Sequence, residues 1–120
     1  MKALSIVSPN GTKIAAGLKT LEVRKWQPFL HADEDLLIVE NTRFLRREGE
    51  KDYDGKAVAI VRVVNIRPFS RADVNAACAN YFEEGWLAWE LTNIRSVACS
   101  KPVLAARGIY DVQIDLKPNQ

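Results

Sequence analysis

Residues 55 to 69, GKAVAIVRVVNIRPF, constrain the fold more than any other part of the chain. The segment is rich in valine and isoleucine, whose β-branched side chains favour an extended backbone. Its apolar residues are nearly continuous, which is typical of a strand that is buried on both faces or closed into a barrel. The sequence therefore predicts a long strand here, covered on both sides.

Other segments also have strand character. Short apolar or alternating runs predict strands at 2–7 (KALSIV), 21–24, 35–41 (DLLIVEN), 86–97 (WLAWELTNIRSV) and 106–116 (ARGIYDVQIDL). Residues 42 to 55 are polar and without clear periodicity, and we expect a long loop there.

Two helices are predicted between these strands. Ser8 is expected to cap the first, with Pro9 at its first helical position, and Gly17 to end it. Ser70 and Asp73 resemble a capping box, with aspartate in place of glutamate or glutamine, and predict a second helix through DVNAACANYF.

Together these elements predict an α+β fold: a small, mostly antiparallel β-barrel with two or three covering helices. A chain of 120 residues is expected to form one domain, residues 1–120. The composition, 48% hydrophobic and 27% charged, excludes a disordered or fibrous chain.

The composition also limits location and cofactors. No segment approaches the ~20 apolar residues that span a bilayer, and no signal peptide is evident, so we expect a cytoplasmic protein without a membrane partner. Cys78 and Cys99 are too few for a disulfide framework or a zinc site. His31 lies in an acidic turn, HADED, where a solvated turn is favoured over a metal site. We therefore predict no metal and no cofactor.

The segment GLKTLEVRKW (17–26) concentrates polar side chains of the right types for binding. Its strand should turn Leu21 and Val23 into the core, because successive side chains alternate. The polar side chains should then line the other face and the preceding turn: Lys19, Glu22, Arg24 and Trp26.

These residue types suit recognition of a polar heterocycle. A lysine beside a glutamate can orient a ligand or, where partly buried, act as a base or nucleophile. Arginine offers a planar fork for a phosphate or a nucleobase edge, and tryptophan offers a stacking face. The alternative is a solvated strand whose exposed ion pairs contribute only about 0–1 kcal/mol each.

The string LSIVSPNGTKIAAGLKTLEVRKW resembles the opening of ASCH (activating signal cointegrator homology) domains, and the later WELTNIRSV is similar to their C-terminal half. The family signature G-x-K-x-x-E-x-R is filled by Gly17, Lys19, Glu22 and Arg24. The resemblance implies a PUA-like fold, a small β-barrel with helices. It also implies that the signature faces RNA or a modified nucleoside in a cleft.

One branch of that family consists of amidohydrolases that remove the acetyl group from N4-acetylcytidine. That branch has the signature lysine, a threonine where this chain has Glu22, and a glutamate near the second helix. Lys19 matches, whereas Glu22 does not, and Thr20 is expected on the wrong face for a nucleophile. The resemblance implies Lys19, Glu22 and a second acid as catalytic candidates.

The second acid stays open among Glu83, Glu84 and Glu90. The first two are expected to flank a helix end. Glu90 is our candidate: it could pair with Lys19, or it could pair with a surface cation. Trp86 and Trp89 should lie on opposite faces of their strand, which places at least one of them in the core.

Two further activities remain as alternatives. A second branch of the family is described as metal-dependent ribonucleases. A non-catalytic RNA-binding module is the other alternative, in which Arg46 and Arg47 of the loop RFLRREGEK would contact phosphates. Neighbouring acidic residues nearly neutralise that loop, so a solvated loop is an equally good interpretation.

Overall fold

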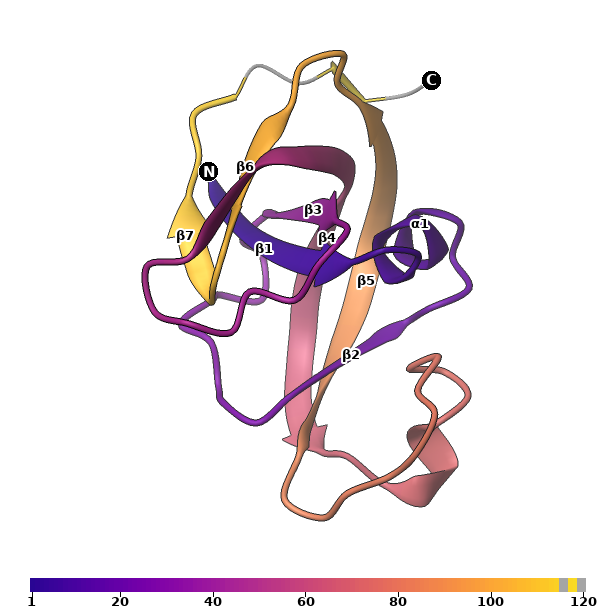
Figure 1. The fold of residues 1–120 in the computed structure, drawn as a ribbon. Coiled ribbons are helices and arrows are strands. Elements are labelled where there is room, and N and C mark those ends of the chain that lie inside the picture. Colours follow the sequence, from indigo (N-terminus) through magenta and orange to yellow (C-terminus); the bar gives the residue numbers. More distant parts are fainter. Residues whose placement is uncertain (115–116, 119–120) are drawn as a thin grey trace.

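A computed structural model describes residues 1–114 and 117–118 of the 120-residue chain. Its elements in chain order are β1 (Lys2–Val7), α1 (Asn10–Ala15), β2 (Leu21–Arg24), β3 (Leu36–Asn41), β4 (Lys51–Pro68), the 3₁₀ turn η1 (Arg71–Asp73), β5 (Leu87–Ala98), β6 (Val103–Ala106), β7 (Ile109–Asp111) and β8 (Lys117–Pro118) (Figure 1). No helix within these residues is long and apolar enough to cross a membrane.

The strands form one sheet in the order β2-β5-β4-β3-β1-β7, with β6 paired to β4 and β8 paired to β5. The pairing of β1 with β3 is parallel, and the other strand pairs are antiparallel. The predicted long strand is confirmed as β4, whose 18 residues pair with β3, β5 and β6.

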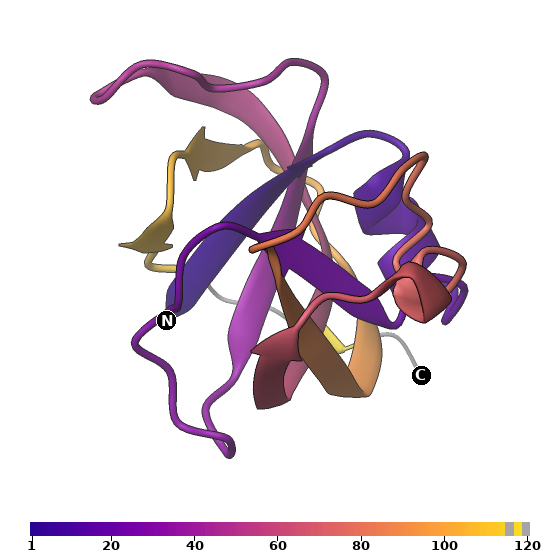
Figure 2. The same ribbon diagram turned by 90° about the horizontal axis from the view of Figure 1, so that it is seen from below.

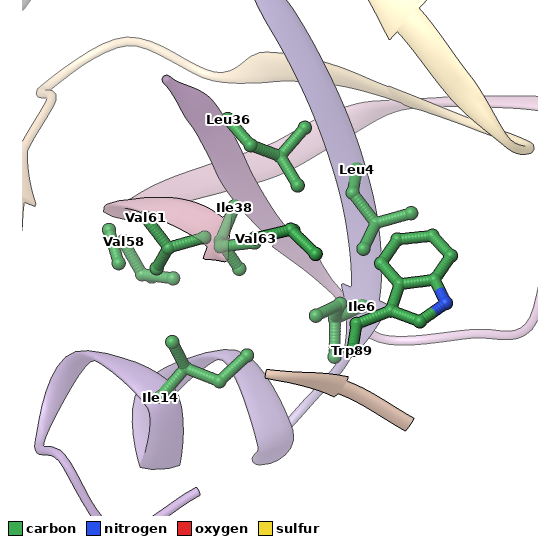
Figure 3. Close-up of a cluster of buried hydrophobic side chains, with 10 residues drawn as sticks. Leu4, Ile6, Ile14, Leu36, Ile38, Val58, Val61, Val63 and Trp89 are labelled. Carbon is green, nitrogen blue, oxygen red and sulfur yellow. The ribbon is translucent and has the colours of Figure 1, made fainter. Parts of the chain in front are cut away.

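The core lies on both faces of the central strands, as the continuous apolar runs predict. In β3, Leu36 and Ile38 belong to one buried cluster, while Leu37 and Val39 belong to another. Figure 3 shows the first cluster, in which α1 contributes Ile14 and β5 contributes Trp89 beside the side chains of β1. Burial on both faces explains why these strands show little alternation.

The predicted barrel is wrong, because the sheet is open. Strands β2 and β7 are the two ends of the hydrogen-bonded order, and no pairing among the described residues joins them. Where β2 approaches β1, a side chain makes the connection instead: Arg24 Nη2 donates to the Ser5 carbonyl at 3.1 Å. A side chain of β2, and not a backbone hydrogen bond, therefore links these two strands at this point.

The prediction of two or three helices is also wrong, since the described residues contain one α-helix. The capping box is confirmed, because the Asp73 carboxylate accepts from the backbone N–H and hydroxyl of Ser70. The helix stops after one 3₁₀ turn, however. Thr20 N–H donates to the carbonyl of Ala76 and Lys19 donates to that of Ala77, so neither carbonyl serves a continuing helix.

The first helix begins differently from the prediction. Pro9, not Ser8, occupies the N-cap position, and no side chain of that residue caps the helix. Instead Glu40 of β3 accepts from Thr12 N–H at 2.6 Å and from its hydroxyl at 2.9 Å. The predicted stop at Gly17 is confirmed by its φ of 77°, which a glycine adopts at low cost.

The strand expected over 106–116 is shorter than predicted. It is confined to β7, and residues 115–116 lie outside the described part of the chain. Strand β6, for which the sequence predicted no separate element, lies just before it.

Gly55 is required where β4 crosses between β3 and β6. A Cβ there would lie 2.5 Å from the Val103 carbonyl oxygen and 2.7 Å from Val39 Cγ1. We expect Gly55→Ala to lower the free energy of unfolding by about 1–3 kcal/mol through overpacking. Chemical denaturation measures this, with the exposed neighbour Lys56→Ala as control; equal stability of the two variants would contradict the prediction.

Candidate functional site

A cleft of about 980 Å³ opens between β1 and β2. Its walls come from the ends of these strands, the loop before β4, the turn at 77–81 and the turn between β6 and β7. In Figure 2 the segment that follows η1 lies beside the end of α1 and the start of β2. The cleft therefore gathers segments that are far apart in the sequence. Its inner wall is formed by the signature strand, β2, together with Lys19 just before it.

Lys19 is buried at the inner wall, with 5% of its surface exposed. The chain turns at Gly17 after α1, which brings this lysine under the segment between β4 and β5. Its Nζ donates to the Ala77 carbonyl at 2.5 Å and pairs with Glu22 Oε1 at 3.2 Å. A lysine this deeply buried needs both partners, because an unpaired buried charge is costly.

Glu22 lies between two cations and is 6% exposed. Its Oε2 accepts from Arg24 Nε at 2.9 Å and lies 2.8 Å from Arg24 Nη2, while Oε1 faces Lys19. Burial raises the pKa of the Glu22 carboxyl, but Arg24 and Lys19 together outweigh burial and lower it below its usual value. Glu22 is therefore ionised at neutral pH, and the Lys19–Glu22–Arg24 triad carries a net positive charge.

The burial of Lys19 and Glu22 excludes a solvated strand. Arg24 is the most exposed member, with its side chain 27% accessible, and it lines the cleft. Its described hydrogen bonds use Nε and Nη2.

Aromatic side chains line the cleft beside the triad. Trp26 is partly exposed and packs edge-on against the buried Trp89, with ring centroids 5.1 Å apart. Tyr81 and Phe44 are largely exposed, and Trp86 lies against Tyr81 at 5.5 Å. Exposed aromatic faces beside hydrogen-bonding groups suit a planar heterocyclic ligand.

The family model for the ASCH domain matches residues 4–100 of this chain. The chain belongs to the ASCH domain family. The match spans the signature strand and ends after β5, so it includes the triad and most of the cleft walls.

Solved structures share the fold of this ASCH domain. The ASCH protein of Zymomonas mobilis matches with a TM-score of 0.55 and 13% identity, over 85% of this chain and 71% of that one. A serine-to-alanine mutant of that protein matches with a TM-score of 0.57 and 15% identity, over 80% of this chain and 70% of that one. A tyrosine-to-phenylalanine mutant matches with a TM-score of 0.58 and 14% identity, over 85% of this chain and 73% of that one. No curated protein matches the chain. The expected PUA-like fold is confirmed, in the form of an open sheet.

The structure separates the other candidate residues of the ASCH domain from the triad. Glu90 accepts from Arg67 Nε at 2.9 Å, so it pairs with a surface cation and not with Lys19. Glu83 and Glu84 are exposed in the turn before β5. None of these three acids lines the cleft.

The two loop arginines singled out in the sequence do not line the cleft. Arg46 and Arg47 are exposed, and their backbone N–H groups donate to Glu50. Their neighbour Arg43 lines the cleft instead, paired with Glu50 at 2.6 Å. The loop thus presents Arg43 to the cleft, whereas the sequence singled out Arg46 and Arg47 for ligand contact.

Some cleft residues had little or no signal in the sequence. The Ala77 carbonyl is a backbone group in a segment that reads as helical, so no residue type marks it. Asn41 is buried at the end of β3 and donates to the Arg43 carbonyl at 2.8 Å. The available signal for Asn41 was its position as a polar residue at the end of an apolar strand.

The acidic turn near His31 is held by ion pairs. Glu34 pairs with Lys2 at 3.1 Å, and Asp35 pairs with Arg95 at 2.6 Å. In the part of the chain that the structure describes, no three His, Cys, Asp or Glu side chains lie close enough to hold a metal.

Proposed function

We propose that the cleft of this ASCH domain binds RNA or a modified nucleoside. One observation carries the proposal: the buried pair Lys19–Glu22 and the partly exposed Arg24 lie beside exposed aromatic side chains in a cleft large enough for a nucleoside. Lys19 uses two of its three N–H groups within the described protein, so one is left for a base carbonyl. Trp26 offers the stacking face.

The leading enzymatic activity is hydrolysis of the amide of N4-acetylcytidine. Water adds to the acetyl carbonyl carbon, the carbon–N4 bond breaks, and N4 takes a proton to give cytidine and acetate. The Lys19 ammonium would stabilise the negative charge that develops on the carbonyl oxygen. Glu22, which is ion-paired on both oxygens, would hold Lys19 and Arg24 in place.

A non-catalytic RNA-binding module is the second candidate, and the position of Thr20 favours it. Thr20 is exposed and does not line the cleft, while the threonine position of the amidohydrolases holds the ion-paired Glu22. The cleft thus lacks the hydroxyl nucleophile of that branch. Binding alone needs only the donors and aromatic faces described above.

The test is to incubate the protein with N4-acetylcytidine and follow cytidine by chromatography. We expect Lys19→Ala to lower the rate by about 100-fold or more, the cost of losing one oxyanion donor. Lys13→Ala, on α1 and outside the cleft lining, is the control. Circular dichroism checks folding, and Lys19→Met replaces Lys19→Ala if the smaller side chain unfolds the protein.

Absence of turnover would contradict the hydrolase and leave the binding module. In that case single-stranded RNA oligonucleotides are titrated while the fluorescence of the tryptophans is followed at several salt concentrations. Binding that weakens with salt and with Lys19→Ala would support the module. Neither turnover nor binding would contradict the proposed function as a whole.

A further inference from the structure

Arg67, near the end of β4, joins this strand to two other segments. Its Nη1 and Nη2 donate to the two carboxylate oxygens of Asp73 at 2.7 and 3.0 Å. Its Nε donates to Glu90 of β5 at 2.9 Å. Such a bidentate arginine–carboxylate pair fixes geometry as well as contributing energy, and the third bond fixes the guanidinium itself.

The segment that Arg67 holds is the turn at residues 70–77. The Asp73 carboxylate also accepts from Ser70 N–H and from its hydroxyl, both at 2.9 Å. The Asp73 carbonyl accepts from Ala77 N–H at 3.0 Å. Asp73 therefore connects Arg67 on one side with the backbone of Ala77 on the other.

The same turn holds the signature lysine. The Ala77 carbonyl accepts from Lys19 Nζ at 2.5 Å. The preceding Ala76 carbonyl accepts from the N–H groups of Thr20 and Leu21, at 2.9 and 3.3 Å. The turn thus fixes both the backbone after Lys19 and the direction of its ammonium group.

We propose that Arg67 is a positioning residue for the cleft, which acts on Lys19 through Asp73 and the Ala77 carbonyl. A lysine side chain is a flexible four-carbon stem, and a single ion pair to Glu22 leaves its ammonium free to rotate. The Ala77 carbonyl removes that freedom. The inference rests on the proposed function only in that Lys19 is the group that meets the ligand.

On this proposal the ion pair between Arg67 and Asp73 does more than stabilise the fold. Apolar contacts of Phe69, Ala77 and Leu21 also hold the turn against the sheet. Loss of Arg67 should therefore leave the protein folded while the turn, and with it the partner of Lys19, shifts. This separates a positioning role from a purely structural one.

The experiment measures the reaction of each lysine with an amine-acetylating reagent, by mass spectrometry of the peptides. In the wild-type chain the buried Lys19 should react far more slowly than Lys2 or Lys13. Arg67→Gln should raise the rate at Lys19 about tenfold relative to these two, and Arg67→Lys should restore part of the protection. Arg62→Gln is the matched control, because Arg62 lies on the same strand and pairs with Asp35.

An unchanged rate at Lys19 in folded Arg67→Gln would overturn the inference. If that variant unfolds, all lysines gain reactivity together, and Asp73→Asn then takes its place with the same expected and contradicting results. The labelling needs no ligand. Suppose that Arg67→Gln selectively raises the acetylation rate of Lys19, while the wild-type chain binds neither N4-acetylcytidine nor RNA. That result would contradict the proposed function and support the positioning role.

Discussion

Replacing Glu22 with alanine is expected to lower the free energy of unfolding by about 3–5 kcal/mol. Glu22 is the single anion between Lys19 and Arg24 in the triad, and Lys19 is almost fully buried. Without the carboxylate, two neighbouring cations remain at the inner wall of the cleft with no charge to balance them. The loss is large because removing one partner of a buried pair leaves the other desolvated.

Chemical denaturation followed by circular dichroism measures this loss. Glu22→Gln separates charge from packing, since it keeps the shape and one acceptor but removes the negative charge. Glu34→Gln is the control, because Glu34 also pairs with a lysine but on the surface, and we expect little change there. A loss for Glu22→Ala as small as that of the control would show that solvent reaches the triad.

The pH dependence provides an independent check on Glu22. The pKa of its carboxyl is lowered in the folded protein, from a usual value of 4.5, although burial opposes this shift. The ion pairs therefore contribute their full stability above that value and lose it as the pH falls through the lower folded pKa. We expect the difference in stability between wild type and Glu22→Gln to shrink over that acidic range.

The sequence predicted the features that depend on local patterns. The apolar run at 55–69 predicted β4, and the spacing of Lys19, Glu22 and Arg24 predicted that their side chains would gather. The first prediction follows from residue type, and the second from the twofold alternation that places Glu22 and Arg24 on one face just after the turn at Lys19. The burial of Lys19 and Glu22 could not be read in the same way, because it depends on segments from elsewhere in the chain.

The features that sequence reasoning missed depend on long-range contacts. The segment 73–82 has a helical start signal, yet its carbonyls bond to Lys19 and Thr20, more than fifty residues earlier. The predicted barrel does not form for a related reason, since β2 contacts β1 through the Arg24 side chain and not through backbone pairing. In both places the polar groups of the cleft compete with regular secondary structure, and local propensity carries no information about that competition.

Trp89→Ala is the second substitution with a large expected effect, about 3–5 kcal/mol lost from the free energy of unfolding. Trp89 is 0% exposed and lies in the main core cluster (Figure 3). It is also the residue of β5 that pairs with Glu22 of β2. Removing it leaves a cavity beside Leu4 and Ile6 and also removes the surface on which Trp26 packs. Both the core and the aromatic wall of the cleft should loosen.

Trp89→Phe should cost clearly less than Trp89→Ala, for a reason specific to this indole. Its buried Nε1–H has no hydrogen-bond partner among the described residues, so phenylalanine removes an unsatisfied donor while it fills part of the space. Denaturation of the two variants gives the comparison, with Trp86→Phe, a partly exposed position, as control. If Trp89→Phe lowered the free energy of unfolding as much as Trp89→Ala, the indole N–H would have to donate to a group other than the described residues, such as a buried water molecule. If Trp89→Ala weakened RNA binding and Trp89→Phe did not, the cleft would require the aromatic surface on which Trp26 packs, and not the indole nitrogen.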